Sequence, residues 1–156
     1  MLRGGIKRVD IDAVLKEALK LLNIDVESIT NERVMYSLLY VLSAVGGIEI
    51  RLGVGTSWKE LINRIFEYEL NGDVEPLPWI RRAVTKVRTL VEDIRRIAGI
   101  GDRMRIIEIV ARVLSICREL YPKPTDLCKT TSMVIDDMDP EIVERICVYL
   151  QKRGLC

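Results

Sequence analysis

Apolar residues recur at the spacing of an α-helix along almost the whole chain of 156 residues, and this spacing limits the fold more than any other feature. In the longest such run the apolar side chains lie three or four positions apart, at Ile80, Val84, Val87, Val91, Ile94 and Ala98. Only residues 48–52 alternate as a β-strand does, and one isolated strand cannot form a sheet. The pattern therefore predicts an all-α protein, a single compact bundle of six or seven helices over residues 1–156 with at most one short extended segment or hairpin.

Capping residues, glycines and prolines mark where the helices begin and end. A side chain such as Ser57 satisfies free amides at a helix start, and a pair such as Gly46-Gly47 ends a helix. The expected helices, bounded by such residues, run from Asp10 or Asp12 to Asn23, over 31–45, from Ser57 to Asn71-Gly72, from Pro76 and Pro78 to Ala98, over 102–120, and from Asp139-Pro140 to Gly154. Between the last two, residues 126–137 are compatible with a short helix.

The composition is that of a folded globular protein rather than a disordered or repetitive one. Hydrophobic residues make up 49% and charged residues 30% of the chain, which is enough apolar material for a core. The longest stretch without a charge, residues 34–48, is too short and too polar to span a membrane. The N-terminal residues are basic, but no apolar run follows them as a secretory signal requires. We therefore expect a cytoplasmic protein that does not contact the membrane.

Several features argue against catalysis. The chain contains no His, the commonest general base and metal ligand, and no nucleophile has a plausible base near it in sequence. Asp136, Asp137 and Asp139 could bind a metal ion, but turn and capping roles account for them more simply. Residues 53–57 have the layout of a phosphate loop but lack its Gly-Lys-Ser/Thr ending. We expect no enzyme activity, no cofactor and no metal site.

Four cysteines leave three alternatives open. Cys117, Cys128, Cys147 and Cys156 include no Cys-x-x-Cys pair, so a zinc or iron–sulfur site would need four thiolates from separate elements. Arg is plentiful, and the chain has one Gln and four Asn, a composition typical of heat-adapted proteins. Because disulfides persist in the cytosol of hyperthermophiles, one or two structural disulfides are favoured slightly over buried thiols and more clearly over a metal site.

The net charge of +1 hides a strong local imbalance. Residues 76–120 contain ten basic and five acidic side chains, and eight of the basic ones lie between positions 81 and 105. All but one of these eight are Arg, whose guanidinium group matches a phosphate with two parallel donors. The same side chains could instead form helix-surface ion pairs, such as Glu92 with Arg96 and Glu108 with Arg112, or meet the acidic residues 67–75 or an acidic partner. Polyanion binding and paired surface charge therefore both remain open.

In the middle of these cations, residues 97–105 read Ile-Ala-Gly-Ile-Gly-Asp-Arg-Met-Arg. A helix, a Gly-hydrophobic-Gly turn and a second helix over residues 87–115 resemble the helix-hairpin-helix element of many DNA-binding proteins. The resemblance implies that Gly99 and Gly101 shape a turn whose backbone amides bind a phosphate, with Arg103 as the nearby cation. Free amides and the positive dipole end of a helix start favour anions in general. The alternative is an ordinary turn in which Gly99 ends one helix and Asp102 caps the next.

These observations predict a non-enzymatic accessory or architectural protein that binds the backbone of DNA or RNA without reading its sequence. The candidate contact residues are Arg81, Arg82, Lys86, Arg88, Arg95, Arg96, Gly99, Gly101, Arg103 and Arg105. The alternative is a helical structural or assembly protein, such as a small subunit of a ribonucleoprotein complex or a viral coat or nucleocapsid protein. Such a protein would form homo-oligomers or join a larger complex. The uncharged helix at 34–48 and Trp79 would then supply the interface, because aromatic residues anchor interfaces.

Overall fold

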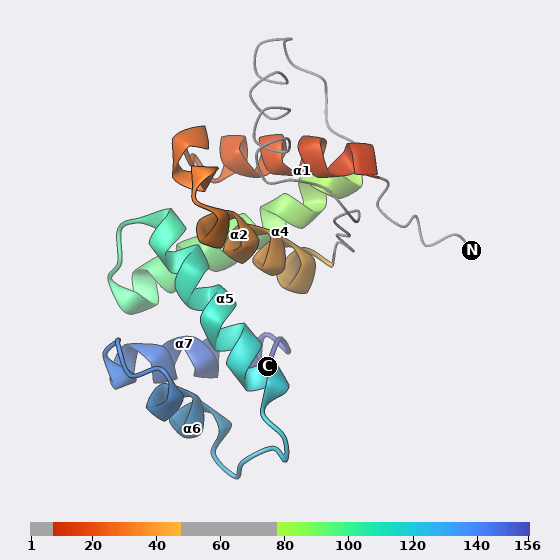
Figure 1. Ribbon diagram of the computed structural model, residues 1–156. Coiled ribbons are helices and arrows are strands. Elements are labelled where there is room, and N and C mark those ends of the chain that lie inside the picture. Colours follow the sequence, from red (N-terminus) through yellow and green to blue (C-terminus); the bar gives the residue numbers. More distant parts are fainter. Residues whose placement is uncertain (1–7, 48–77) are drawn as a thin grey trace, which may run out of the picture. The chain divides into compact units, whose positions relative to one another are not determined.

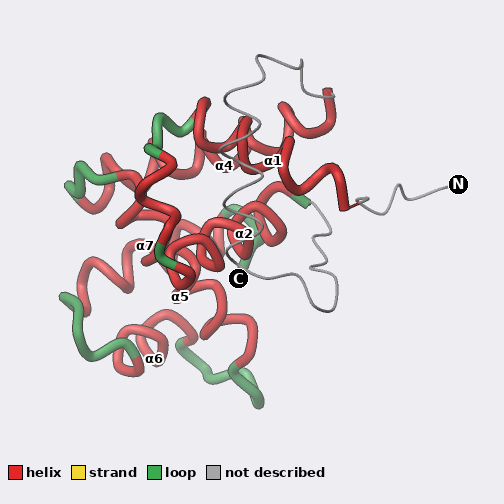
Figure 2. Tube along the Cα trace, turned by 45° about the horizontal axis from the view of Figure 1, so that its top comes forward, coloured by secondary structure: helices red, strands yellow, loops and turns green. Residues whose placement is uncertain are grey.

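The computed structural model describes residues 8–47 and 78–156, and all of its regular structure in these ranges is helical (Figure 1). The elements are α1 (Arg8–Leu21), the short 3-10 helix η1 (Val26–Thr30), α2 (Glu32–Gly46), α4 (Pro78–Ala98), α5 (Arg103–Glu119), α6 (Leu127–Val134) and α7 (Pro140–Lys152). The all-α prediction is confirmed, since the described residues contain no strand (Figure 2). The strand-like residues 48–52, the loop at 53–57 and the helix expected from Ser57 lie outside the described residues.

Most helix ends lie where local capping predicts them. The Asn31 side chain accepts a hydrogen bond from the amide of Arg33 at 3.0 Å at the start of α2, and Gly47 ends that helix with φ +71°. Asp139 caps α7 in the same way by accepting from the amide of Glu141 at 3.0 Å. A short helix, α6, does form within residues 126–137.

The start of the first helix differs from the prediction. Because α1 already begins at Arg8, Asp10 and Asp12 are both inside the helix and neither is its N-cap. Acidic residues are favoured both at the N-cap and in the first turn of a helix. An acidic residue near the start of a helix therefore does not show by itself whether it is the N-cap or lies in the first turn.

The chain divides into two compact units, residues 1–89 (unit 1) and residues 90–156 (unit 2). The boundary lies within α4, which is one uninterrupted helix. The single domain expected over residues 1–156 stays a prediction.

In unit 1, small residues bring α2 and α4 together. A Cβ atom added at Gly46 of α2 would lie 3.1 Å from the Cβ of Ala83 in α4. The uncharged helix proposed from the sequence as an interface is partly buried, since Met35, Leu38, Leu39, Val41 and Leu42 of α2 all belong to the core. Trp79 is half-buried and Tyr36 is exposed. Five apolar side chains of α2 are therefore already part of the core, and its other apolar residues are partly or fully exposed.

In unit 2, α5 is the central helix. Nine of its 17 residues are buried: Met104, Ile106, Ile107, Ile109, Val110, Ala111, Val113, Leu114 and Cys117. Helices α6 and α7 pack against each other and against α5. Asp137, in the connection before α7, accepts from the Arg112 guanidinium with both carboxylate oxygens at 2.9 Å. This ion pair replaces the local Glu108–Arg112 pair that the helical spacing suggested.

Two disulfides fasten the same unit, which resolves the alternatives left open for the cysteines. Cys117 in α5 is bonded to Cys156, and Cys128 in α6 is bonded to Cys147 in α7, so no cysteine is free. The Arg118 guanidinium also donates to the carbonyl of Leu155 at 2.9 Å. Residues near the C-terminal end of the chain are thus held to α5 by one covalent bond and one hydrogen bond.

Candidate nucleic-acid interface

Helix α4 carries most of the cations predicted to bind nucleic acid, and its two faces differ sharply. The buried face consists of Ile80, Ala83, Val84, Val87, Leu90, Val91 and Ile94. These residues follow the three- and four-residue spacing of one helix face, so the basic residues between them point to the opposite side. Of the ten predicted contact residues, Arg81, Arg82, Lys86 and Arg88 belong to unit 1 and the other six to unit 2.

The four cations of unit 1 form an exposed basic face, which we call the α4 basic face. Arg81, Arg82, Lys86 and Arg88 are all exposed, and none of them forms an ion pair with a carboxylate in the described part of the chain. Thr85 lies among them, and its hydroxyl donates to the carbonyl of Arg81 at 2.7 Å. No acidic side chain lies between positions 81 and 89 of this helix. Within the described residues, the charge of this face is therefore not offset by a paired carboxylate.

The cations of unit 2 are in a different state, because acidic residues lie beside them. The Glu92 carboxylate accepts from Arg103 Nε at 3.0 Å and lies 3.6 Å from an Arg95 nitrogen. Arg96 forms an ion pair with Asp93. The four-residue spacing had suggested Glu92 as its partner instead. The hydrogen bond from Arg103 is the main reason why the pKa of Glu92 lies below its ordinary value. Three of the predicted contact cations are thus paired with two carboxylates.

Asp93 also joins α4 to α7 within unit 2. The Tyr149 hydroxyl donates to Asp93 Oδ2 at 2.6 Å, and this hydrogen bond is the main cause of the lowered pKa of Asp93. Burial, followed by the same hydrogen bond, raises the pKa of Tyr149 to about 12. Sequence reasoning missed this contact because 56 positions separate the two residues, and no local pattern marks such a pair.

The Gly-Ile-Gly turn between α4 and α5 is capped at both ends. The amide of Gly99 donates to the carbonyl of Arg95 at 3.0 Å, and Gly99 has φ +67°, a backbone conformation that favours glycine. Asp102 caps α5 by accepting from the amide of Met104 at 3.0 Å. Gly101 is exposed, with open space where a Cβ would lie. Gly99 thus ends α4 and Asp102 caps α5, as expected for an ordinary turn between two helices. The phosphate cradle implied by the helix-hairpin-helix resemblance stays a prediction.

Arg105 is exposed in the first turn of α5, and its charge helps to lower the pKa of Asp137, whose main partner is Arg112. The Arg105 guanidinium is therefore close enough to the Asp137 carboxylate to interact with it electrostatically. Of the predicted contact cations of unit 2, Arg105 is the one whose side chain forms no hydrogen bond or ion pair with a described residue.

Among the described residues, no group of three or more His, Cys, Asp or Glu side chains is arranged to hold a metal ion. Asp137 and Asp139 are engaged with Arg112 and with the start of α7. None of the described helices is long and apolar enough to cross a membrane.

No protein-family model, curated protein or solved structure matches this chain.

Proposed function

We propose that this protein binds the sugar-phosphate backbone of DNA or RNA, without reading the base sequence, through the α4 basic face. The observation that carries the proposal is the set of four exposed cations, Arg81, Arg82, Lys86 and Arg88, with no carboxylate paired to them among the described residues. From the first to the last they span about 10 Å of helix axis. One strand of duplex DNA carries about three phosphates over that length.

The chemistry of this face suits phosphate better than it suits bases. Three of the four cations are Arg, which can donate two parallel hydrogen bonds to one phosphate. No Asn, Gln or aromatic side chain, the usual groups for reading or stacking bases, lies between positions 81 and 89. Binding would therefore depend on charge and on the release of counterions, and would be insensitive to sequence.

The cations of unit 2 contribute less in this proposal. Arg95, Arg96 and Arg103 already face Glu92 and Asp93, so a phosphate would have to compete with a carboxylate for each of them. Asp102 adds a negative charge at the start of α5. The turn at Gly99 and Gly101 is then at most a secondary contact.

Fluorescence anisotropy with labelled single-stranded and duplex DNA and RNA, titrated at several salt concentrations, tests the proposal. If all four cations engage phosphates, affinity falls by roughly a hundredfold between about 50 and 200 mM salt. Replacing Arg81 and Arg82 together by Gln should reduce the slope of log affinity against log salt by about 2.

The matched control replaces Arg95 and Arg96 by Gln, which removes the same net charge from the paired part of the helix. We expect a distinctly smaller change in the salt slope for this variant. Absence of binding at low salt would contradict the proposed function. Equal losses in both variants would leave the function standing but contradict the assignment to the α4 basic face.

A further inference from the structure

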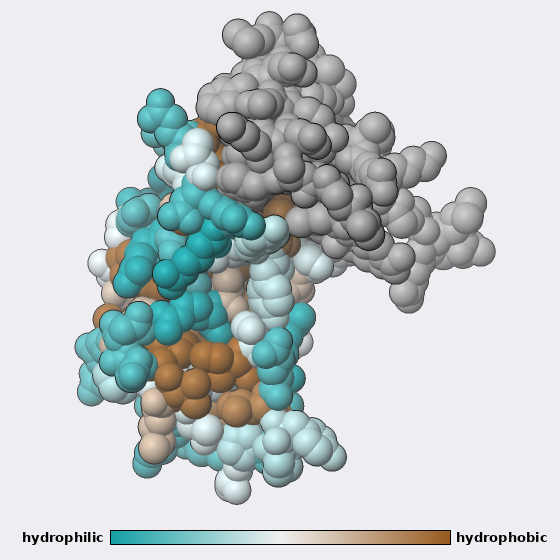
Figure 3. All heavy atoms as spheres, in the orientation of Figure 1, coloured by the Kyte–Doolittle hydropathy of each residue, from teal (hydrophilic) through white to brown (hydrophobic). Residues whose placement is uncertain are grey.

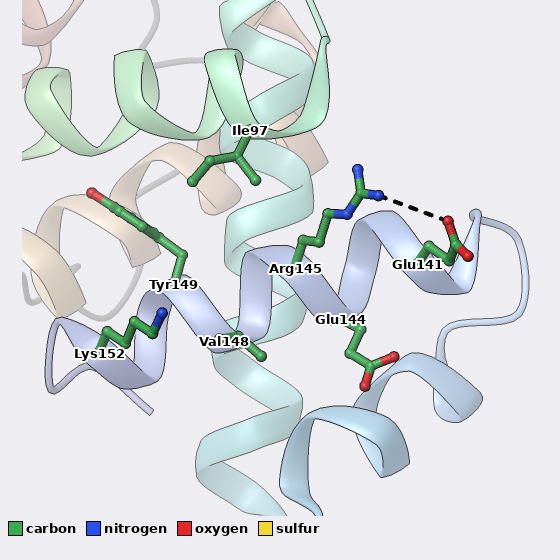
Figure 4. A pocket seen from close by; sticks show the side chains of 7 residues that line it. All are labelled: Ile97, Glu141, Glu144, Arg145, Val148, Tyr149 and Lys152. Carbon is green, nitrogen blue, oxygen red and sulfur yellow. Dashed lines mark ion pairs between the residues drawn. The ribbon is translucent and has the colours of Figure 1, made fainter.

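Unit 2 has a groove that the proposed function does not use. It has a volume of about 470 Å³ and lies along the exposed side of α7, with Ile97 from the end of α4 at its edge (Figure 4). Tyr149 lines the groove, and its hydroxyl is held by Asp93. The space-filling view shows apolar side chains exposed among hydrophilic ones in the region where Figure 1 draws the lower half of α5 together with α6 and α7 (Figure 3). An apolar groove with a charged rim is typical of a protein interface.

The order of charges along α7 gives this groove a direction. Glu144, Val148 and Lys152 follow one another at four-residue intervals, so they form one line along the helix surface. Val148, in the centre, is 37% exposed. Glu144 and Lys152 form no ion pair with any described residue, whereas Arg145 lies 3.9 Å from Glu141. The line therefore has a negative end, an apolar centre and a positive end.

We infer that the groove is occupied by α7 of a second copy of this chain, packed antiparallel about a two-fold axis near Val148. In this arrangement Glu144 faces Lys152 of the partner subunit, and the symmetry repeats the same contact on the other side. Val148 meets its own counterpart on the axis, beside the aromatic ring of Tyr149. A parallel arrangement would instead bring like charges together, which is unfavourable.

The self-complementary charge order is what selects a second copy over an unrelated helix. A foreign partner would need an apolar centre with a positive and a negative residue four positions to either side of it. Helix α7 meets this requirement itself, because its acidic and basic residues are equally far from Val148. One residue set thus supplies both halves of the interface, as a symmetric dimer requires.

Sedimentation equilibrium of the full chain, with its disulfides intact, tests the inference by a charge swap. We expect a reversible dimer of twice the 17.8 kDa chain mass. Glu144→Lys alone and Lys152→Glu alone each create like-charge contacts and should weaken dimerisation by at least about tenfold. The double variant Glu144→Lys with Lys152→Glu restores opposite charges and should return the affinity to within about threefold of the original chain.

A second variant keeps the test independent of these charges. Val148→Asp changes an exposed side chain, so the helix content measured by circular dichroism should persist while the dimer is lost. A chain that remains monomeric at several hundred micromolar would overturn the inference. So would a dimer whose affinity is unchanged by the single charge reversals, since that dimer would use another surface.

Discussion

Gly46 of α2 lies so close to Ala83 of α4 that a Cβ atom added at Gly46 would be 3.1 Å from the Cβ of Ala83 and 3.2 Å from its carbonyl oxygen. This contact joins the two helices through their smallest side chains. It also orients α4, because Ala83 can face α2 only if Arg81, two positions before it, points to the opposite side of the helix. The exposure of the α4 basic face therefore depends on a close helix contact on the other side of the same helix.

A larger side chain at Gly46 should destabilise unit 1. In Gly46→Leu the new side chain has to displace Ala83 and its backbone, and we expect a loss of about 1–3 kcal/mol in the free energy of unfolding. Urea denaturation followed by circular dichroism measures this loss. Arg33→Leu, at an exposed position in the same helix, is the control and should stay within about 0.5 kcal/mol of the original chain. Equal effects of the two substitutions would contradict the close contact.

The two glycines of the α4–α5 turn should respond differently to alanine. Gly99 has φ +67°, so Gly99→Ala forces a side chain into the left-handed region and should destabilise the protein by about 1–2 kcal/mol. Gly101 does not have a positive φ and has open space around it, so Gly101→Ala should be neutral, or stabilising by up to about 1 kcal/mol. Thermal unfolding of both variants separates the two cases, and similar shifts would contradict the turn geometry.

The same Gly101→Ala variant tests the phosphate cradle that the helix-hairpin-helix resemblance implies. A methyl group at this exposed position would hinder the approach of a phosphate to the turn amides while leaving the fold intact. If the turn binds a phosphate, the affinity for duplex DNA at low salt should fall in this variant. Unchanged affinity in a folded Gly101→Ala protein would leave the α4 basic face as the site of contact.

Removing the Tyr149 hydroxyl should weaken unit 2 and change its acid sensitivity. Tyr149→Phe removes the 2.6 Å hydrogen bond to Asp93, and we expect a loss of about 1 kcal/mol at neutral pH, since Asp93 is partly exposed and screened by solvent. The pKa of Asp93 should rise back toward its ordinary value. Urea denaturation at neutral pH and NMR titration of the Asp93 carboxyl measure these two effects, and an unchanged Asp93 pKa would contradict the hydrogen bond.

The signs of the two pKa shifts predict opposite pH limits for this contact. The pKa of Asp93 is lower in the folded chain than in the unfolded one, so its stabilising contribution is present above about pH 4 and is lost as the pH falls through the folded value. The pKa of Tyr149 is raised to about 12, so its contribution is complete below about pH 10 and is lost as the pH rises toward 12. The difference in the free energy of unfolding between the original chain and Tyr149→Phe should therefore be largest near neutral pH and become smaller at both low and high pH.

The two disulfides should contribute unequally to stability. Cys117–Cys156 spans 39 positions and Cys128–Cys147 spans 19, and the longer loop loses more freedom in the unfolded chain when it is closed. Replacing each pair by Ala should lower the free energy of unfolding by about 4 and about 3 kcal/mol respectively. A count of free thiols in denaturant without reductant checks that both disulfides are present in the original chain. If they are, no free thiol is detected.

Local pattern was enough to predict most of the helix ends in the described residues. The apolar spacing of residues 80–94, the caps at Asn31, Asp102 and Asp139, and the glycine at position 47 all act between neighbours within one turn of helix. Such interactions can be predicted from the sequence because the chain geometry already brings these residues together. The clustering of cations along α4 was predictable for the same reason.

The tertiary structure decided the contacts between residues that lie far apart in the sequence. Arg103 reaches Glu92 across the turn, Arg112 reaches Asp137, and Tyr149 reaches Asp93 over 56 positions, and none of these pairs follows from helical spacing. Four cysteines allow three pairings, and only the packing of α5, α6 and α7 selects one of them. A contact between distant positions depends on the path of the whole chain between them, whereas a helix depends on each residue and its neighbours. For this reason the sequence determined the helices and the basic face, and the fold determined which side chains from distant positions pair with one another.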